Sequence, residues 1–122
     1  MAKSESAARV GELGEDYVAQ RLLNLGYRIL DRNWRIREGE LDLVALSESG
    51  VIIFVEVKTR TSAAYGDPLE AIGGDKALRI QRLALAWLAT HQRLGSIYRI
   101  DAAGVLLTRS GQIQLDYREA VL

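Results

Sequence analysis

Apolar residues recur at helical spacing near the start of the chain. They form one stripe between positions 6 and 25, and its members are Val10, Leu13, Tyr17, Val18, Leu22 and Leu25. This period predicts an amphipathic helix, and Gly26 is expected just after it because glycine readily takes the left-handed conformation that ends helices. Glu15 lies at the border of the stripe. From there its carboxylate either leans over the sheet that the helix covers or points to solvent.

Runs of apolar and β-branched residues predict five strands. The clearest pair is residues 39–46 and 51–60, which the polar segment Ser47-Glu48-Ser49-Gly50 joins into a hairpin. The strands expected outside this hairpin are residues 27–32 (which residues 33–35 either continue or end in a turn), 97–107 and 112–117.

A second helix is predicted in the second half of the chain. The polar residues 59–68 form a loop, and Asp67-Pro68 is expected to cap a short helical turn that Gly73-Gly74 ends. Asp75 then fits the N-cap position of the longest helix, which runs from Lys76 to about Gln92. The core face expected for this helix consists of Ile80, Leu83, Ala84, Trp87 and Leu88.

The order of these elements indicates the fold class. One helix, three strands, a long helix and two strands predict an α/β protein with a mixed β-sheet flanked by helices. We expect a single domain over residues 1–122. A regular Rossmann alternation does not fit this order. Gly11 and Gly14 begin a helix without a preceding strand, which argues against a dinucleotide-binding loop.

Three charged residues interrupt the apolar hairpin. Asp42 lies within the first arm, and Glu56 and Lys58 lie near the end of the second. Charged groups are rare in central strands unless they are paired or functional. If the hairpin pairs Leu46 with Ile52, Asp42 lies directly opposite Glu56. The two carboxylates then repel each other, and either a divalent cation such as Mg²⁺ or an ion network with Lys58 removes the repulsion.

The composition indicates the class of protein and the cellular compartment. A hydrophobic fraction of 48% and a charged fraction of 26% over 122 residues are typical of a soluble globular protein. The absence of cysteine excludes a disulfide framework and a thiolate metal site, which agrees with a reducing cytoplasm. Neither a signal peptide nor a membrane span is recognisable, so we expect a cytoplasmic protein without a membrane partner.

The charge balance gives mixed indications about nucleic acid. The net charge of zero provides no bulk attraction to a polyanion. Arginine accounts for 13 of the 16 basic residues and suits phosphate contacts, although such a composition also follows from genomic base content. His91, the only histidine, has no second histidine with which to bind a metal, and we assign it no role. The basic residues that form either a solvated surface or a phosphate-binding lip are Arg35, Arg37, Arg60, Lys76, Arg79 and Arg82.

The hairpin motif also carries a family resemblance. Asp42, thirteen further residues and then Glu56-Val57-Lys58 resemble the signature of the restriction-endonuclease-like, or PD-(D/E)xK, nuclease superfamily. Over nearly its whole length the chain resembles the YraN-type family of bacterial proteins, which is similar to archaeal Holliday-junction resolvases. The segments that carry this resemblance are Gly-Tyr-Arg-Ile-Leu at 26–30, Arg-Asn-Trp-Arg at 32–35, Gly-Glu-Leu-Asp-Leu-Val-Ala at 39–45, Phe-Val-Glu-Val-Lys-Thr-Arg at 54–60 and Tyr-Gly-Asp-Pro at 65–68.

The resemblance implies a restriction-endonuclease-like core and roles for specific residues. Asp42 and Glu56 would be metal ligands, Lys58 the catalytic lysine, and Glu15 the helix glutamate that completes the acidic cluster. The carbonyl of Val57 is a further candidate ligand. Leu41 departs from the superfamily pattern, because a proline that has no catalytic part usually stands there. Two residues before Asp42, Glu40 either extends the acidic cluster or only shapes the start of the strand.

These expectations lead to one main functional hypothesis and two alternatives. The main hypothesis is a Mg²⁺- or Mn²⁺-dependent endonuclease that hydrolyses phosphodiester bonds in branched or otherwise structured DNA. The first alternative is a non-catalytic nucleic-acid-binding module that retains the nuclease fold, and the second is a protein-interaction subunit. A homodimer would suit a four-way junction, which offers two equivalent cuts, and the sequence leaves the oligomeric state open.

Overall fold

A computed structural model describes residues 5–61 and 73–122 of the chain. Within these ranges the expected order of elements is confirmed, whereas the expected short helical turn before Gly73 lies outside the described residues. The elements are α1 (Glu5–Asn24), β1 (Arg28–Ile36), β2 (Gly39–Leu46), β3 (Ile52–Arg60), α2 (Asp75–Thr90), β4 (Tyr98–Leu107) and β5 (Ile113–Arg118).

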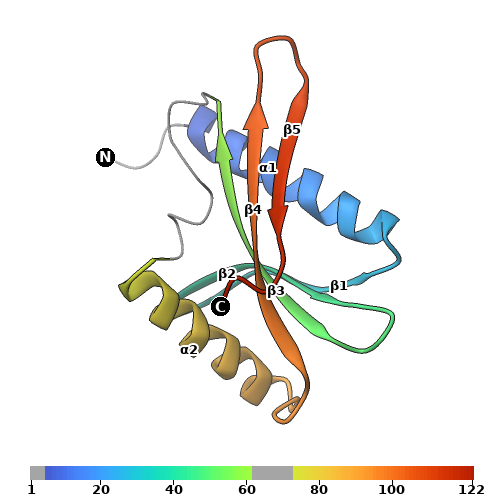
Figure 1. Ribbon diagram of the computed structural model, residues 1–122. Coiled ribbons are helices and arrows are strands. Elements are labelled where there is room, and N and C mark those ends of the chain that lie inside the picture. The colour runs from blue at the N-terminus through green and yellow to red at the C-terminus, as the bar shows by residue number, and fades with distance from the viewer. Residues whose placement is uncertain (1–4, 62–72) are drawn as a thin grey trace.

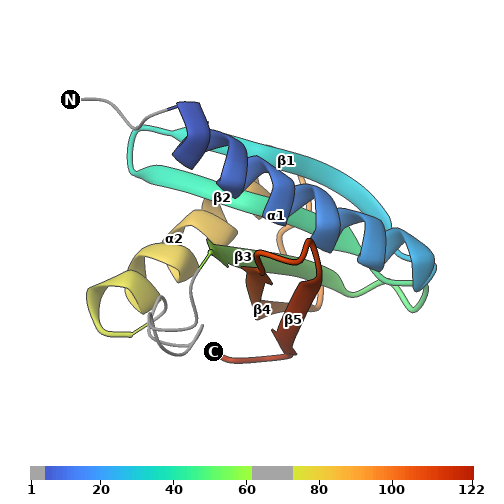
Figure 2. The same ribbon diagram turned by 90° about the horizontal axis from the view of Figure 1, so that it is seen from above.

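The five strands form one mixed sheet in the order β1-β2-β3-β4-β5. β3 and β4 run parallel, because the segment that contains α2 returns the chain to the same end of the sheet, and the other neighbours are antiparallel. Figures 1 and 2 show α1 and α2 on opposite faces of the sheet. The α/β class and the mixed sheet flanked by helices are therefore confirmed.

Each helix covers its own apolar core. Side chains alternate along β3, so that Ile53 and Val55 pack towards α1 while Ile52 and Phe54 pack towards α2. All five residues predicted for the core face of α2 are buried: Ile80, Leu83, Ala84, Trp87 and Leu88. Burial of both sheet faces explains why β3 begins as a continuous apolar run.

The expected stripe of α1 is correct only in its centre. Val18 and Leu22 are buried, but Leu13 and Leu25 are 47% and 55% exposed. Leu13 lies about 140° around the helix from Val18 at 3.6 residues per turn, and Leu25 follows the last helical residue. Ala19, which the stripe omitted, is buried instead.

Glycines at both helix boundaries explain where the helices stop and start. Gly26 has a φ of +88° and its N–H bonds to Leu23, while Tyr27 N–H reaches Leu22 O, as in a Schellman motif. The expected C′ role of Gly26 is confirmed. The N-cap prediction for Asp75 was one residue late, because Gly74, with a φ of +59°, occupies the cap and Asp75 is already helical.

The hairpin strands separate at the point where its charged residues begin. The register pairs Leu46 with Ile52 as expected, and the ladder between β2 and β3 ends at Leu43 and Val55. Beyond this point β2 continues beside β1 and β3 continues beside β4 to Arg60. The sheet therefore opens into a fork between its second and third strands.

Candidate functional site

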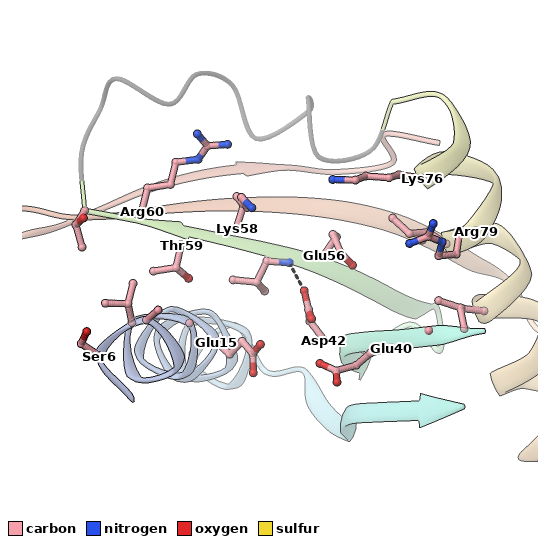
Figure 3. A pocket seen from close by; sticks show the side chains of 18 residues that line it. Ser6, Glu15, Glu40, Asp42, Glu56, Lys58, Thr59, Arg60, Lys76 and Arg79 are labelled. Carbon is pink, nitrogen blue, oxygen red and sulfur yellow. Dashed lines mark hydrogen bonds between the residues drawn. The ribbon is translucent and has the colours of Figure 1, made fainter. Parts of the chain in front are cut away.

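Asp42 lies in this fork, and its side chain accepts a hydrogen bond from the backbone of β3. The N–H of Val57 donates to Asp42 Oδ2 at 2.8 Å (Figure 3). The regular alternation of β2 breaks here as well, because Leu41 packs towards α2 whereas Leu43 packs towards α1. The ladder ends one pair before Asp42 and Glu56, so the expected cross-strand pairing of these two residues is not formed, although both line the same cleft. The fork thus holds one carboxylate on each of the two diverging strands.

Two further carboxylates lie beside Asp42. One oxygen each of Glu15, Glu40 and Asp42 lies within 4.8 Å of the others. Glu15 comes from α1. The helical pattern left open whether its carboxylate leans over the sheet or points to solvent, and the structure shows that it leans over the sheet. Glu40 extends the acidic cluster, as one of its two expected roles required.

Gly14 lets α1 approach β3 closely enough to deliver Glu15. A Cβ atom at Gly14 would lie 1.7 Å from Thr59 Oγ1 and 2.8 Å from Thr59 Cβ. Such distances are far inside van der Waals contact, so no larger residue fits without displacement of the helix or of Thr59. A Cβ atom at Gly11, in contrast, would meet nothing within 4 Å.

Hydrogen bonds and ion pairs hold the two outer carboxylates. Asn33 Nδ2 donates to Glu15 Oε1 at 2.9 Å and to Glu40 Oε1 at 3.3 Å. Arg35 donates to the other oxygen of Glu40, from Nε at 2.9 Å and from Nη2 at 2.5 Å. Arg32 Nη2 lies 3.9 Å from Glu15 Oε1 and pairs with Asp16. Both carboxylates are therefore oriented by residues of β1.

The crowding of carboxylates changes their protonation. Burial and the nearby charges of Glu15 and Glu40 raise the pKa of Asp42 to about 6, against the opposing hydrogen bond from Val57. Burial and the nearby Asp42 raise the pKa of Glu56 to about 8. Burial also raises the pKa of Glu15. Asp42 and Glu56 therefore stay protonated to a higher pH than ordinary carboxylates do, and a positive charge beside them would favour their ionised forms.

Lys58 does not supply that charge. Within the described ranges, no salt bridge joins Lys58 to Asp42 or to Glu56, so the ion network that the sequence left open is not formed. Lys58 is exposed on β3 beside Gly104 of β4. The positive charge of Lys76 lowers the pKa of Glu56 but does not offset the raising contributions.

A cleft of about 1160 Å³ contains these groups. It lies between the first half of α1, the fork and the start of α2 (Figure 3). Three of the arginines expected to contact phosphate, Arg35, Arg37 and Arg82, do not line this cleft. Arg35 lies instead in a smaller neighbouring hollow, where its side chain is 77% exposed. The residues proposed from the sequence that the cleft does bring together are Glu15, Asp42, Glu56, Val57, Lys58, Arg60, Lys76 and Arg79.

The donor set fits a hard divalent cation. Its side-chain donors are carboxylate oxygens, which Mg²⁺ and Mn²⁺ prefer, and soft ligands are lacking because the chain has no cysteine. Burial is the main cause of the raised pKa values of Asp42 and Glu56, neighbouring carboxylates add to it, and a bound cation would offset that repulsion. Asp42 and Glu56, with Glu15, Glu40 and the carbonyl of Val57, are the groups that could hold it.

Two residues of this arrangement were missed by the sequence reasoning. Asn33 was noted only as part of the Arg-Asn-Trp-Arg segment, because a polar residue in a weakly alternating segment is expected to be solvated. Gly14 was considered only as part of a Gly-Glu-Leu-Gly segment, which does not reveal which glycine faces the sheet. Both act through contacts with residues distant in the sequence.

Comparison with known proteins identifies the family. The sequence model of "Uncharacterised protein family UPF0102" matches residues 14–105, and the chain belongs to this family, which is the YraN-type family that its motifs resemble. A UPF0102 protein of Frankia casuarinae is 45% identical over 108 residues, which cover 88% of this chain and 91% of the relative. A UPF0102 protein of Leifsonia xyli subsp. xyli is 40% identical over the full length of both chains.

Two solved structures are similar at the level of the backbone. One is a repair endonuclease from Pyrococcus abyssi, with a TM-score of 0.44 and 15% identity over 91% of this chain and 41% of the other. The second is SfsA of Pyrococcus furiosus in complex with Ca²⁺, with a TM-score of 0.44 and 21% identity over 93% of this chain and 63% of the other. The chain thus spans less than two thirds of either structure.

Proposed function

We propose that this protein is a Mg²⁺- or Mn²⁺-dependent endonuclease that hydrolyses phosphodiester bonds in branched or otherwise structured DNA. The observation that carries the proposal is the fork in the sheet, which gathers Asp42 and Glu56 in one cleft. Lys58 and the basic residues Lys76 and Arg79 line the same cleft. Acidic ligands for a cation and bases for phosphates in one cleft are the components that phosphodiester hydrolysis requires.

The residues divide the chemistry between them. A divalent cation bound at the fork would neutralise charge that develops on the scissile phosphate. Asp42 and Glu56, with Glu15 and the Val57 carbonyl, would hold this cation. Lys58 would orient the attacking water and stabilise the negative charge of the transition state.

Basic residues at the rim would contact the DNA backbone. Lys76 and Arg79 lie in the first turns of α2, and Arg60 ends β3 on the other side of the cleft. Contacts of these residues with phosphates would fix the position of the DNA without reading its sequence. Arg35, Arg37 and Arg82 lie outside the cleft and would extend this contact to flanking DNA.

Cleavage assays test the proposal. Four-way junction, flap and linear duplex DNA are incubated with the wild-type protein in Mg²⁺, in Mn²⁺ or in EDTA. We expect metal-dependent cleavage of the branched substrates that is lost in Asp42→Asn and in Lys58→Ala. Asp116→Asn is the matched control and should leave cleavage unchanged, because this exposed aspartate pairs with Arg118 on the edge strand β5 and does not line the cleft.

The same assays distinguish the alternative function. A non-catalytic nucleic-acid-binding module would bind these substrates, as measured by fluorescence anisotropy, without cutting them in either metal. Absence of both binding and cleavage would contradict every nucleic-acid function and favour a protein-interaction subunit. Analytical ultracentrifugation, alone and with a junction, tests the proposed homodimer. None of the helices in the described part of the chain is long and apolar enough to cross a membrane.

A further inference from the structure

Asn33 occupies an unusual position beside the proposed metal site. Its neighbours Arg32 and Trp34 pair with Leu43 and Leu41, so Asn33 lies next to Asp42 in the sheet. It has a φ of +53°, which is left-handed backbone within a strand. Asparagine tolerates this conformation better than most residues, and the conformation turns its side chain out of the ordinary strand alternation.

The amide of Asn33 links two carboxylates that come from different elements. Its single nitrogen donates to Glu15 Oε1 at 2.9 Å and to Glu40 Oε1 at 3.3 Å. An amide NH₂ group has two hydrogens, and these two contacts use both. Glu15 belongs to α1 and Glu40 to β2, so the bond pair connects the helix to the sheet. Without it the two carboxylates, which lie close to each other, would repel and separate.

Arg35 does not replace this link. The guanidinium of Arg35 binds Oε2 of Glu40, whereas Asn33 binds Oε1. Arg32 pairs with Asp16, and its Nη2 lies 3.9 Å from Glu15 Oε1, which is too far for a hydrogen bond. Among the side chains that the structure describes, Asn33 is therefore the one that hydrogen-bonds to both outer carboxylates.

We propose that Asn33 is a positioning residue that sets the separation of Glu15 and Glu40 around the cation, an inference that rests on the proposed function. The hydrogen bonds are exposed, so their net contribution to folding is small. Their effect falls on the geometry of the ligands. Groups that orient metal ligands typically change metal affinity by about 10- to 100-fold when removed.

Isothermal titration calorimetry with Mn²⁺ tests this role independently of catalysis. The full chain is freed of metal and titrated at pH 8 as wild type, Asn33→Gly and Asn33→Ala. Glycine retains the left-handed backbone without strain and lacks the amide, while alanine lacks the amide and adds backbone strain. The matched control is Asn24→Gly, which removes an exposed asparagine that hydrogen-bonds to Gln20 at the far end of α1. Circular dichroism confirms that each variant is folded.

We expect Asn33→Gly and Asn33→Ala to weaken Mn²⁺ binding by about 10-fold or more, and Asn24→Gly to bind as wild type does. Wild-type affinity in either Asn33 variant would overturn the inference and leave the proposed function standing. An equal loss in Asn24→Gly would also overturn it, because the effect would then be general. A wild-type protein that binds no Mn²⁺ would overturn the proposed function and the inference together.

Discussion

Stability of the metal-free protein should fall as the pH rises through neutrality. Burial and, to a smaller extent, neighbouring carboxylates raise the pKa values of Asp42 and Glu56. At a pH between the ordinary and the raised pKa values, the folded chain therefore binds more protons than the unfolded chain. Stability from such groups is fully present below the unfolded pKa and is lost as the pH passes the folded pKa. The window therefore extends from about pH 4 to about pH 8.

The size of this effect follows from the two pKa values. Above pH 5 both carboxyl groups are largely ionised in the unfolded chain. In the folded chain Asp42 stays protonated for about one further pH unit and Glu56 for about three, and the free energy of unfolding falls over these intervals. At about 1.4 kcal/mol for each unit, the upper bound is roughly 5–6 kcal/mol. The cleft opens to solvent, which screens the charges, so we expect a loss of about 2–3 kcal/mol. Glu56→Gln should remove most of this loss.

Urea unfolding followed by circular dichroism measures the effect. The free energy of unfolding is determined in EDTA from pH 5 to pH 9 for the wild type, for Glu56→Gln and for the control Glu119→Gln, an exposed residue outside the cleft. Saturating Mg²⁺ should restore the stability of the wild type at pH 8, by about 2.7 kcal/mol at 100 times its dissociation constant. A wild-type free energy that does not fall from pH 5 to pH 9, or an equal fall in Glu56→Gln, would refute the reasoning.

Two further substitutions test the surroundings of the site. Gly14→Ala should destabilise the fold by about 1–3 kcal/mol in urea unfolding, because its methyl group would overlap Thr59. Gly11→Ala is the control and should be neutral or stabilising by up to about 1 kcal/mol. Equal effects of the two substitutions would contradict the close approach of α1. Lys76→Ala should weaken DNA binding at all sequences and reduce the slope of log affinity against log salt by about one, which anisotropy titrations at several salt concentrations measure. An unchanged slope would exclude a phosphate contact.

Local patterns sufficed for the parts of the fold that depend on periodicity. The apolar period of α2 predicts its buried face, and the apolar arms with a polar joint predict the hairpin and its pairing of Leu46 with Ile52. The fork was not predictable in this way. The fork exists because β2 stays paired with β1, and β3 with β4, at the point where β2 and β3 separate from each other. Which of these strand pairs persists depends on all four strands together and cannot be predicted from any one segment.

The site shows the same division between local and distant information. Asp42 and Glu56 were recognisable because charge is unusual within apolar strands. Asn33 and Gly14 look ordinary in sequence, and their importance comes from the side chains that they meet across the fold. Arg35 is a further example, because its ion pair with Glu40 was not apparent from the sequence.

The zero net charge of the chain can be reconciled with a nucleic-acid substrate through the arrangement of its charges. Carboxylates occupy the floor of the cleft, and Arg60, Lys76 and Arg79 lie around them. Without a cation, the floor would repel the phosphate that the rim attracts, so bulk attraction is weak. If a cation binds as proposed, it converts the floor into an attractive surface. Binding of metal and of DNA would then strengthen each other by the same factor, since linkage between two ligands is reciprocal. A chain of zero net charge would then still bind DNA once its cation is bound, because attraction at the cleft replaces bulk attraction.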